Sequence, residues 1–312
     1  MTESIKSLNL DANQTAFFSR ELEYIKARTY DVEYPELKAM QLIPVSSEAG
    51  PGAESITYQQ FDQMGLAQII ANYAQDLPRA DIKGKEFTTP VRSLGTSYGY
   101  SLQEIRAAQF AGRNLEQRKA NAARRAVEQK MNKIAWFGNE DYGLQGFITN
   151  PNVTRAAVED DGTGSTTQWE NKTPDQILRD MNDLVNGIID LTNGVEMPNT
   201  LLMPIKQWTQ ISTTARSSTS DTTILEFFLR NSPAITSVEW VNELKGASQL
   251  TPGQDIMIAY DRNPDKLSFE VPQLFEQFPA QERGLEFVVP AHARVSSVLI
   301  YYPLSISIGE GI

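Results

Sequence analysis

The chain has 312 residues, no cysteine, a single histidine (His292) and a net charge of −11. The lack of cysteine excludes a disulfide scaffold, a thiol nucleophile and cysteine metal sites, and one histidine is too few for a histidine-rich metal site or for most histidine-based triads. The acidic balance disfavours non-specific nucleic-acid binding, and the sequence has neither an 18-residue apolar run nor an apolar signal core, which predicts a protein outside the membrane that stays in the cell that makes it.

A short amphipathic helix is predicted over residues 11–28, because Phe18, Leu22 and Ile25 recur at spacings of four and three. The single apolar face of this helix has to be covered by something. The pattern leaves open whether the helix docks on the protein's own core or on a neighbouring molecule. Residues 30–45 are predicted to be extended chain interrupted by two prolines.

Residues 56–100 show strand-like patterns and no helical periodicity. A strand is predicted at 56–60, and 87–100 is predicted to be extended. Residues 65–86 lie between them and contain no partner strand of their own, which favours a long two-stranded excursion. Such a hairpin is marginally stable alone in water, so it needs support from outside itself.

Residues 101–137 give the strongest local signal and predict one continuous helix of about 55 Å. Ser101 and Glu104 form a capping box, no proline interrupts the segment, and Gly138 is a plausible stop. The segment contains eight Arg or Lys residues and three Glu residues, which gives it a net charge of +5. The basic helix predicts either an acidic partner surface or a solvated face with internal ion pairs, and both remain open. The predicted apolar stripe comprises Leu102, Ile105, Ala108, Leu115, Ala122, Ala126, Met131 and Ile134.

A second capped helix is predicted to open at Thr173, with Gln176 completing the capping box and proline at the first helical position. Its expected apolar face comprises Ile177, Met181, Leu184, Val185, Ile188 and Leu191. Further elements are predicted as strands at 200–204, 236–241 and 255–260 and helices at 205–213 and 224–230. After residue 263 the alternating pattern predicts an antiparallel C-terminal sheet.

No group of residues points to catalysis or to metal binding. Asp160 and Asp161 lack the spacing of an EF-hand and are predicted to lie in a solvated loop. The GTG at 162–164 lacks the Gly-Lys-Ser/Thr of a phosphate loop, and no GxSxG motif is present. We therefore predict no catalytic, metal or cofactor site, which favours a structural or assembly protein over an enzyme.

Three motifs, in this order, resemble the major capsid proteins of tailed bacteriophages. They are GLAQIIANYAQDLPRADIKGKE (65–86), YSLQEIRAAQFAGRNLEQRKANAARRAVEQKMNKIAWFG (100–138) and YGLQGFITNPNV (142–153). The resemblance implies an α+β, Hong Kong 97-like capsid fold. Its expected parts are an N-terminal arm (1–52), an extended β-hairpin loop (53–100), a peripheral domain (101–172 and 263–312) with a spine helix (101–137), and an axial domain (173–262).

The resemblance also implies a function. The chain is expected to self-assemble through pentamers and hexamers into an icosahedral phage head that encloses double-stranded DNA without binding it specifically, and to need no cofactor. Portal, scaffolding and decoration proteins are expected partners. The expected location is the virion, with assembly in the host cytoplasm. Because the arm begins almost at Met1, scaffolding is expected from a separate protein or from an N-terminal piece absent from this sequence.

The expected subunit interfaces follow from the projecting and basic parts. The residues expected there are Phe18, Leu22, Ile25, Arg79, Lys83, Lys85, Arg92, Arg113, Arg124 and Arg125. Three alternatives stay open. An encapsulin-like shell would load cargo enzymes, a tail or decoration protein would form tubes or rings, and an acidic soluble hydrolase would contain a deep pocket with converging carboxylates.

Overall fold

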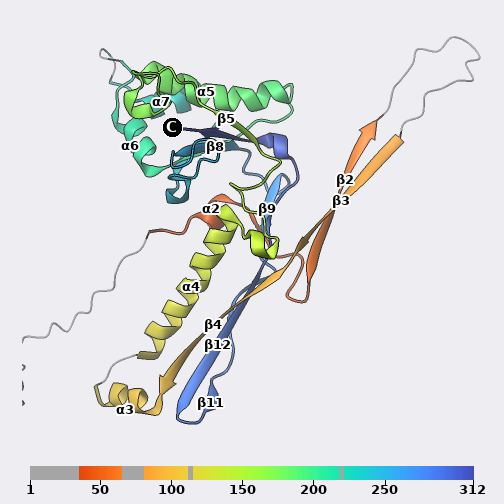
Figure 1. Ribbon diagram of the computed structural model, residues 1–312, viewed down its shortest axis with the longest axis vertical. Helices are drawn as coiled ribbons and strands as arrows, with labels where there is room; N and C mark the ends of the chain where they lie inside the picture. Colours follow the sequence, from red (N-terminus) through yellow and green to blue (C-terminus); the bar gives the residue numbers. More distant parts are fainter. Residues whose placement is uncertain (1–34, 65–80, 112–114, 218, 220) are drawn as a thin grey trace, which may run out of the picture. The chain divides into compact units, whose positions relative to one another are not determined.

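The protein is described by a computed structural model that covers residues 35–64, 81–111, 115–217, 219 and 221–312 (Figure 1). The chain divides into two units, Met1–Glu36 and Leu37–Ile312, and every element below belongs to the second unit. The helix predicted over residues 11–28 lies outside the described residues. Within the described ranges, no helix has the length and apolar content needed to cross a bilayer.

A five-stranded sheet forms the centre of one half of this unit. Its strands, in spatial order, are β5 (Thr154–Ala157), β14 (Ile306–Glu310), β8 (Ile256–Tyr260), β6 (Thr200–Met203) and β7 (Ser237–Trp240). Every residue of β6, β8 and β14 is buried. Strands that are covered on both faces are expected to be apolar throughout, which explains why 200–204 and 255–260 can be predicted as strands from sequence.

The side chains on the two faces of this sheet pack into two separate hydrophobic cores. Ile256 and Ile258 pack into a cluster that includes α4 (Leu115–Phe137), whereas Met257 and Ala259 pack into a second cluster on the opposite face. The second cluster is covered by three helices, α5 (Pro174–Leu191), α6 (Ile205–Thr213) and α7 (Ile224–Asn231). Alternating side chains of one strand therefore join both cores.

Helix α5 begins as predicted. The Thr173 hydroxyl accepts a hydrogen bond from the Gln176 backbone N–H, and the Gln176 side chain accepts one from the Thr173 N–H at 2.8 Å. The predicted apolar face is buried up to Ile188. Leu191 is the exception, because it ends the helix and is 55% exposed.

The prediction of one antiparallel sheet after residue 263 is wrong, because the C-terminal strands belong to three sheets. β9 (Leu267–Glu270) joins β1 (Val45–Ser46) and β13 (Val298–Ile300), and β12 (Glu286–Val295) joins β10 (Gln273–Gln277) and β11 (Gln281–Arg283). The last strand, β14, lies between β5 and β8 in the five-stranded sheet. Its small residues permit this position. A Cβ on Gly309 would lie 2.8 Å from Met257 Cε.

The single helix predicted over 101–137 is divided in the structure. Helix α3 spans Leu102–Ala111 and α4 begins at Leu115, and residues 112–114 between them lie outside the described residues. The predicted capping box is present, since the Glu104 N–H donates to Ser101 Oγ at 3.1 Å and the Ser101 N–H donates to Glu104 Oε2 at 3.2 Å.

The buried stripe of α4 differs in register from the predicted one. Ala123 and Val127 are buried, whereas Ala122 and Ala126, which were expected there, are exposed. The stripe continues through Met131 and Ile134 into the core. Gly138 ends the helix as predicted. Its φ of +68° lies in the left-handed region, and a Cβ there would lie 2.3 Å from the Leu144 carbonyl oxygen.

Candidate assembly surfaces

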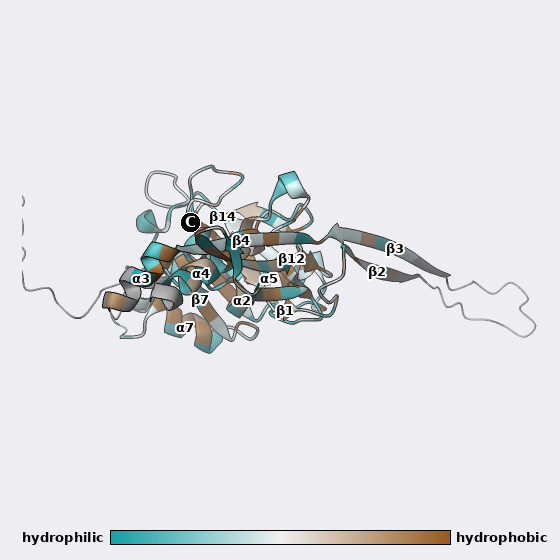
Figure 2. Cartoon of the chain, turned by 90° about the horizontal axis from the view of Figure 1, so that it is seen from below, coloured by the Kyte–Doolittle hydropathy of each residue, from teal (hydrophilic) through white to brown (hydrophobic). Residues whose placement is uncertain are grey.

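A two-stranded hairpin leaves its side chains unburied over the residues for which burial is described. Strands β2 (Ser55–Met64) and β3 (Asp81–Pro90) pair antiparallel over ten residues each, from Ser55 opposite Pro90 to Met64 opposite Asp81. None of the hairpin side chains for which burial is described is buried, and both strands mix hydrophilic with hydrophobic residues (Figure 2). The predicted two-stranded excursion is confirmed over the described residues. Because an isolated hairpin is marginal in water, this one has an exposed surface suited to a partner.

The base of the hairpin is fastened to the rest of the unit. The Tyr58 ring stacks on Phe87 with centroids 5.1 Å apart and meets the edge of Tyr301 at 5.0 Å. Thr89 Oγ1 lies 2.8 Å from Ser297 Oγ. Farther along, Phe61 covers Gly84, where an added Cβ would lie 3.0 Å from the ring. The hairpin is therefore anchored at one end by aromatic and hydroxyl contacts.

The cations predicted on the extended loop are placed in different ways. Arg79 lies outside the described residues, and for Lys83 the structure describes the backbone register opposite Asp62. Lys85 is exposed, with its Nζ 4.7 Å from the centre of the Phe87 ring. Arg92 is the first residue of β4 (Arg92–Ser101), which pairs with β12 and not with the hairpin strands. Its Nε donates to the Tyr142 carbonyl at 3.1 Å.

The basic face of α4 contains the internal ion pair of the solvated alternative, and the acidic partner surface stays a prediction. Arg124 forms an internal ion pair with Glu128 at 2.8 Å, yet the Arg124 side chain is 65% exposed. Arg125 is half-buried, and Arg113 lies outside the described residues. Lys119 instead ties the helix to its surroundings, donating to the Gly99 carbonyl at 2.7 Å and to Glu104 at 3.0 Å. Other exposed cations of α3 and α4 are Arg106, Arg118, Lys130 and Lys133.

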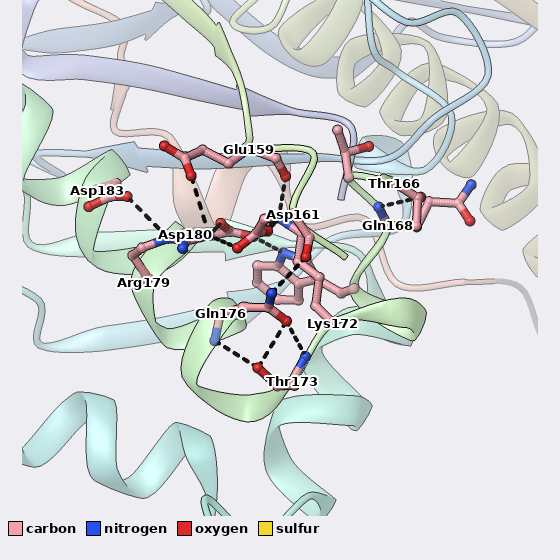
Figure 3. A network of polar contacts seen from close by, with 12 residues as sticks. Glu159, Asp161, Thr166, Gln168, Lys172, Thr173, Gln176, Arg179, Asp180 and Asp183 are labelled. Atoms are coloured by element: carbon pink, nitrogen blue, oxygen red, sulfur yellow. Dashed lines mark hydrogen bonds and ion pairs between the residues drawn. The ribbon is translucent and has the colours of Figure 1, made fainter. Parts of the chain in front are cut away.

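A buried ion pair fastens the loop before α5 to that helix (Figure 3). Lys172 Nζ lies 2.6 Å from Asp180 Oδ2, and the two side chains are 0% and 1% exposed. The Lys172 ammonium also donates to the Glu159 carbonyl at 2.6 Å, and Trp169 Nε1–H donates to Asp180 at 3.0 Å. The charge pair therefore has additional hydrogen bonds inside the fold, which a buried pair needs.

The outer part of this network corrects the prediction of a solvated Asp160–Asp161 loop. Asp160 is exposed, but Asp161 contacts Arg179 and lies 3.2 Å from Lys172. The hydrogen bond from Arg179 holds the pKa of Asp161 below its usual value. Burial raises the pKa of Asp180 even though the Lys172 ammonium acts in the opposite direction. Because the network pairs its carboxylates with cations, we interpret it as a structural ion-pair network that holds the loop before α5 against that helix.

Sequence reasoning missed the residues that make these fastenings. Lys172 and Asp180 are eight positions apart, on a loop and on the following helix, and no periodicity marks them as partners. Tyr58 and Tyr301 are separated by most of the chain. No sequence pattern marks Lys172 as buried, because lysine is usually exposed and this one lies in a turn-rich stretch.

Comparison with known proteins adds two findings. The family described as "Major capsid protein" matches residues 65–312. A comparison with curated proteins gives no match. The matched range contains β3, α4 and the whole five-stranded sheet, whose two faces contribute to the two cores.

Solved structures share the fold at low sequence identity. The capsid of Myoviridae phage XM1 matches with a TM-score of 0.81 and 18% identity, over 94% of this chain and 98% of that one. The capsid of an empty GTA particle matches with a TM-score of 0.63 and 11% identity, over 93% and 95%. A virus-like particle from Pyrococcus furiosus matches with a TM-score of 0.55 and 13% identity, over 87% and 91%. The expected Hong Kong 97-like fold is confirmed by these likenesses.

Proposed function

This chain belongs to the major capsid protein family, and we propose that its copies assemble through pentamers and hexamers into an icosahedral phage head around double-stranded DNA. The observation that carries the proposal is the hairpin β2–β3, a ten-residue ladder without a buried side chain among those described. A neighbouring copy would supply the missing support. Closed shells are built by repeating such contacts under symmetry, so each can be weak on its own.

Electron microscopy of the purified full-length chain tests the proposal. We expect closed shells of uniform size, and isometric particles with packaged DNA when the chain is produced together with its phage. Tubes or rings would favour a tail or decoration protein. Shells that enclose a cargo enzyme would favour the encapsulin-like alternative. A chain that stays monomeric at high concentration would contradict the proposal.

The division into parts is proposed along the same lines. We propose residues 1–52 as the arm, 53–100 as the extended loop, 101–172 and 263–312 as the peripheral domain, and 173–262 as the axial domain. Two strand pairings cross the proposed limits: β4 (Arg92–Ser101) pairs with β12, and β14 pairs with β8.

The remaining parts of the proposal concern partners and location. A capsid protein is a component of the virion, and we propose assembly in the host cytoplasm with portal, scaffolding and decoration proteins. The chain would act without catalysis or a cofactor. Its net charge of −11 supports a shell wall that does not adhere to packaged DNA, because like charges repel.

Charge reversal on α4 is expected to impair assembly. Arg124→Glu should lower the yield of particles by roughly tenfold, because every copy presents the same face and the loss recurs at each contact. Particle yield is measured by sedimentation and microscopy. The matched control is Arg230→Glu on α7. Arg230 forms the same type of pair with Glu226, and its side chain is 64% exposed, compared with 65% for Arg124. Equal yields from the two variants would contradict a role for the basic face.

A further inference from the structure

A pocket of about 690 Å³ lies at the base of the hairpin. Its walls come from β1 and the residues beside it, from β2, from the start of β9 and from the turn after β13. Three tyrosines from distant parts of the sequence belong to the lining, Tyr58, Tyr301 and Tyr302. The pocket therefore arises from the tertiary fold, next to the element whose exposed surface suits a partner.

The charged residues of the described lining are both carboxylates. They are Glu48 and Asp265, and both residues are exposed. Neither carboxylate forms an ion pair with a cation among the described residues. Lys266 Nζ lies 5.5 Å from the centre of the Tyr302 ring, but this ammonium pairs with Glu196. The pocket therefore has a negative charge that the described part of the chain leaves uncompensated.

A third carboxylate lies behind the wall of the pocket. Glu270 is 4% exposed, and its Oε1 accepts a hydrogen bond from Ser268 Oγ at 2.7 Å. Ser268 Oγ also lies 2.8 Å from the Tyr301 hydroxyl. Burial raises the pKa of Tyr301, and the charges of Glu270 and Glu48 raise it further. The negative charge therefore extends from the rim of the pocket into the protein behind it.

Aromatic rings beside carboxylates are suited to binding a cation. The face of an aromatic ring attracts an ammonium or guanidinium group within about 6 Å of its centre. Carboxylates add Coulomb attraction and accept charge-assisted hydrogen bonds. Packaged DNA does not fit, because its phosphates have the same sign of charge as the pocket. An occupant should therefore be a protein surface with exposed Lys or Arg side chains.

Helix α4 of the same chain presents such a surface. Lys130 and Lys133 are exposed, and neither forms an ion pair with a carboxylate among the described residues. Residues three positions apart are neighbours on one face of a helix. In its own copy Lys130 lines a different groove, between β4, α4 and residues 139–144, which shares no lining residue with the pocket. The two ammonium groups are therefore available to another molecule.

The symmetry of a ring favours a second copy as that molecule. Successive copies in a pentamer or hexamer are related by rotation, so one surface of each copy meets a different surface of the next. The pocket and the α4 lysines are two such surfaces, made of different residues and opposite in charge. The same contact can then repeat around the ring until it closes.

We propose that Lys130 and Lys133 of one copy dock in the pocket of an adjacent copy. Their ammonium groups pair with Glu48 and Asp265, and the Tyr301 ring adds a cation–π contact. The inference rests on the proposed shell assembly and names one charge-paired contact within it. It also supplies the acidic partner surface that the sequence predicts for the basic helix.

Carbodiimide coupling of the assembled natural chain tests this contact. The reagent activates a carboxyl group, and a neighbouring lysine amine then forms an amide with it while the carboxyl oxygen leaves in the urea product. Equal amounts of unlabelled and heavy-nitrogen chain are mixed before assembly, and linked peptides are identified by mass spectrometry. We expect links from Lys130 or Lys133 to Glu48 or Asp265. About half of these links should join a light and a heavy peptide, because adjacent copies mix at random.

An ion pair within one copy provides the internal control. Lys206 and Glu170 form an exposed pair, so their link should form and should always join peptides with the same label. Shells that show this control link without the links from α4 to the pocket overturn the inference and leave shell assembly standing. Links from α4 to the pocket that always have one label would place the contact within a copy and also overturn it. A chain that forms no shells overturns the proposed function and the inference with it.

A charge exchange provides a second test. Glu48→Lys combined with Asp265→Lys should lower the particle yield roughly tenfold, because like charges then meet at every contact. Adding Lys130→Glu and Lys133→Glu to this variant reverses the other side and should restore most of the yield. Melting of the unassembled chain should stay unchanged in both variants, since all four residues are exposed. If the fourfold variant gave no more particles than the twofold variant, the pairing would be refuted.

Discussion

Replacing Lys172 with methionine is expected to lower the free energy of unfolding by about 3–5 kcal/mol, the largest loss expected from a single substitution in this charged network. The reason is the fully buried Asp180 carboxylate, which would keep the Trp169 hydrogen bond and the more distant Arg179 at 3.7 Å but lose the Lys172 ammonium at 2.6 Å. Denaturant unfolding of the unassembled chain, followed by circular dichroism, measures the effect.

Two comparison variants make this expectation specific. Lys206→Met breaks an ion pair with Glu170 in which both side chains are more than half exposed, and should lose at most about 1 kcal/mol. Lys172→Met combined with Asp180→Asn should recover part of the loss, since no buried charge remains and the Asn oxygen can still accept from Trp169. The single variant Asp180→Asn is measured as well. If the free-energy loss of the double variant equalled the sum of the losses from Lys172→Met and Asp180→Asn, the two residues would not be coupled.

The loss from Lys172→Met should also depend on pH. Burial raises the pKa of Asp180, and removing the Lys172 ammonium should raise it further. A carboxyl group with a raised pKa in the folded state contributes stability at acid pH that is lost as the pH rises through that pKa. The difference from the natural chain should therefore grow between acid and neutral pH. A difference that stayed constant would contradict this account.

Removing the hairpin is expected to abolish shell formation and leave the rest of the chain folded. In the variant, two glycines replace residues 56–89. Ser55 and Pro90 are in register, so a two-residue turn can join them. The melting temperature should change by only a few degrees because the hairpin has no buried side chain among those described. Particle yield should fall by at least roughly a hundredfold, since every copy loses the same contact surface.

Sedimentation of the hairpin variant gives the yield, and circular dichroism reports whether the chain is folded. Shells of normal size and number from a folded variant would show that the hairpin does not hold copies together. A variant that unfolds would show that the base contacts of Tyr58 with Tyr301 and of Thr89 with Ser297 carry more of the fold than their exposure indicates.

Local signals predicted the helices well where a cap and an apolar face coincide. Thr173 with Gln176 fixed the start of α5, and Ser101 with Glu104 fixed the start of α3. These signals act over three or four residues, so they are visible in the chain. The register of the α4 stripe was missed by one residue at Ala122 and Ala126, because alanine is tolerated on exposed as well as buried helix faces.

The positions of the strands in their sheets could not be predicted in the same way. Arg92–Ser101 has the alternation of a strand, but its partner β12 is almost 200 residues away. β14 reads like the other C-terminal strands and yet lies beside β5 and β8. Strand pairing depends on contacts between segments that are distant in sequence, and no local pattern in a single sequence indicates which segments will pair.

By itself, the sequence determined the α+β character, the capped helices, the unsupported hairpin and, through three ordered motifs, the resemblance to major capsid proteins. These features follow from patterns within a few turns of chain. Only the tertiary structure decided that Lys172 is buried against Asp180, that β14 completes the five-stranded sheet and that β4 pairs with β12. Burial and pairing arise from packing between remote segments, and the free energy of each depends on which partner the fold brings near.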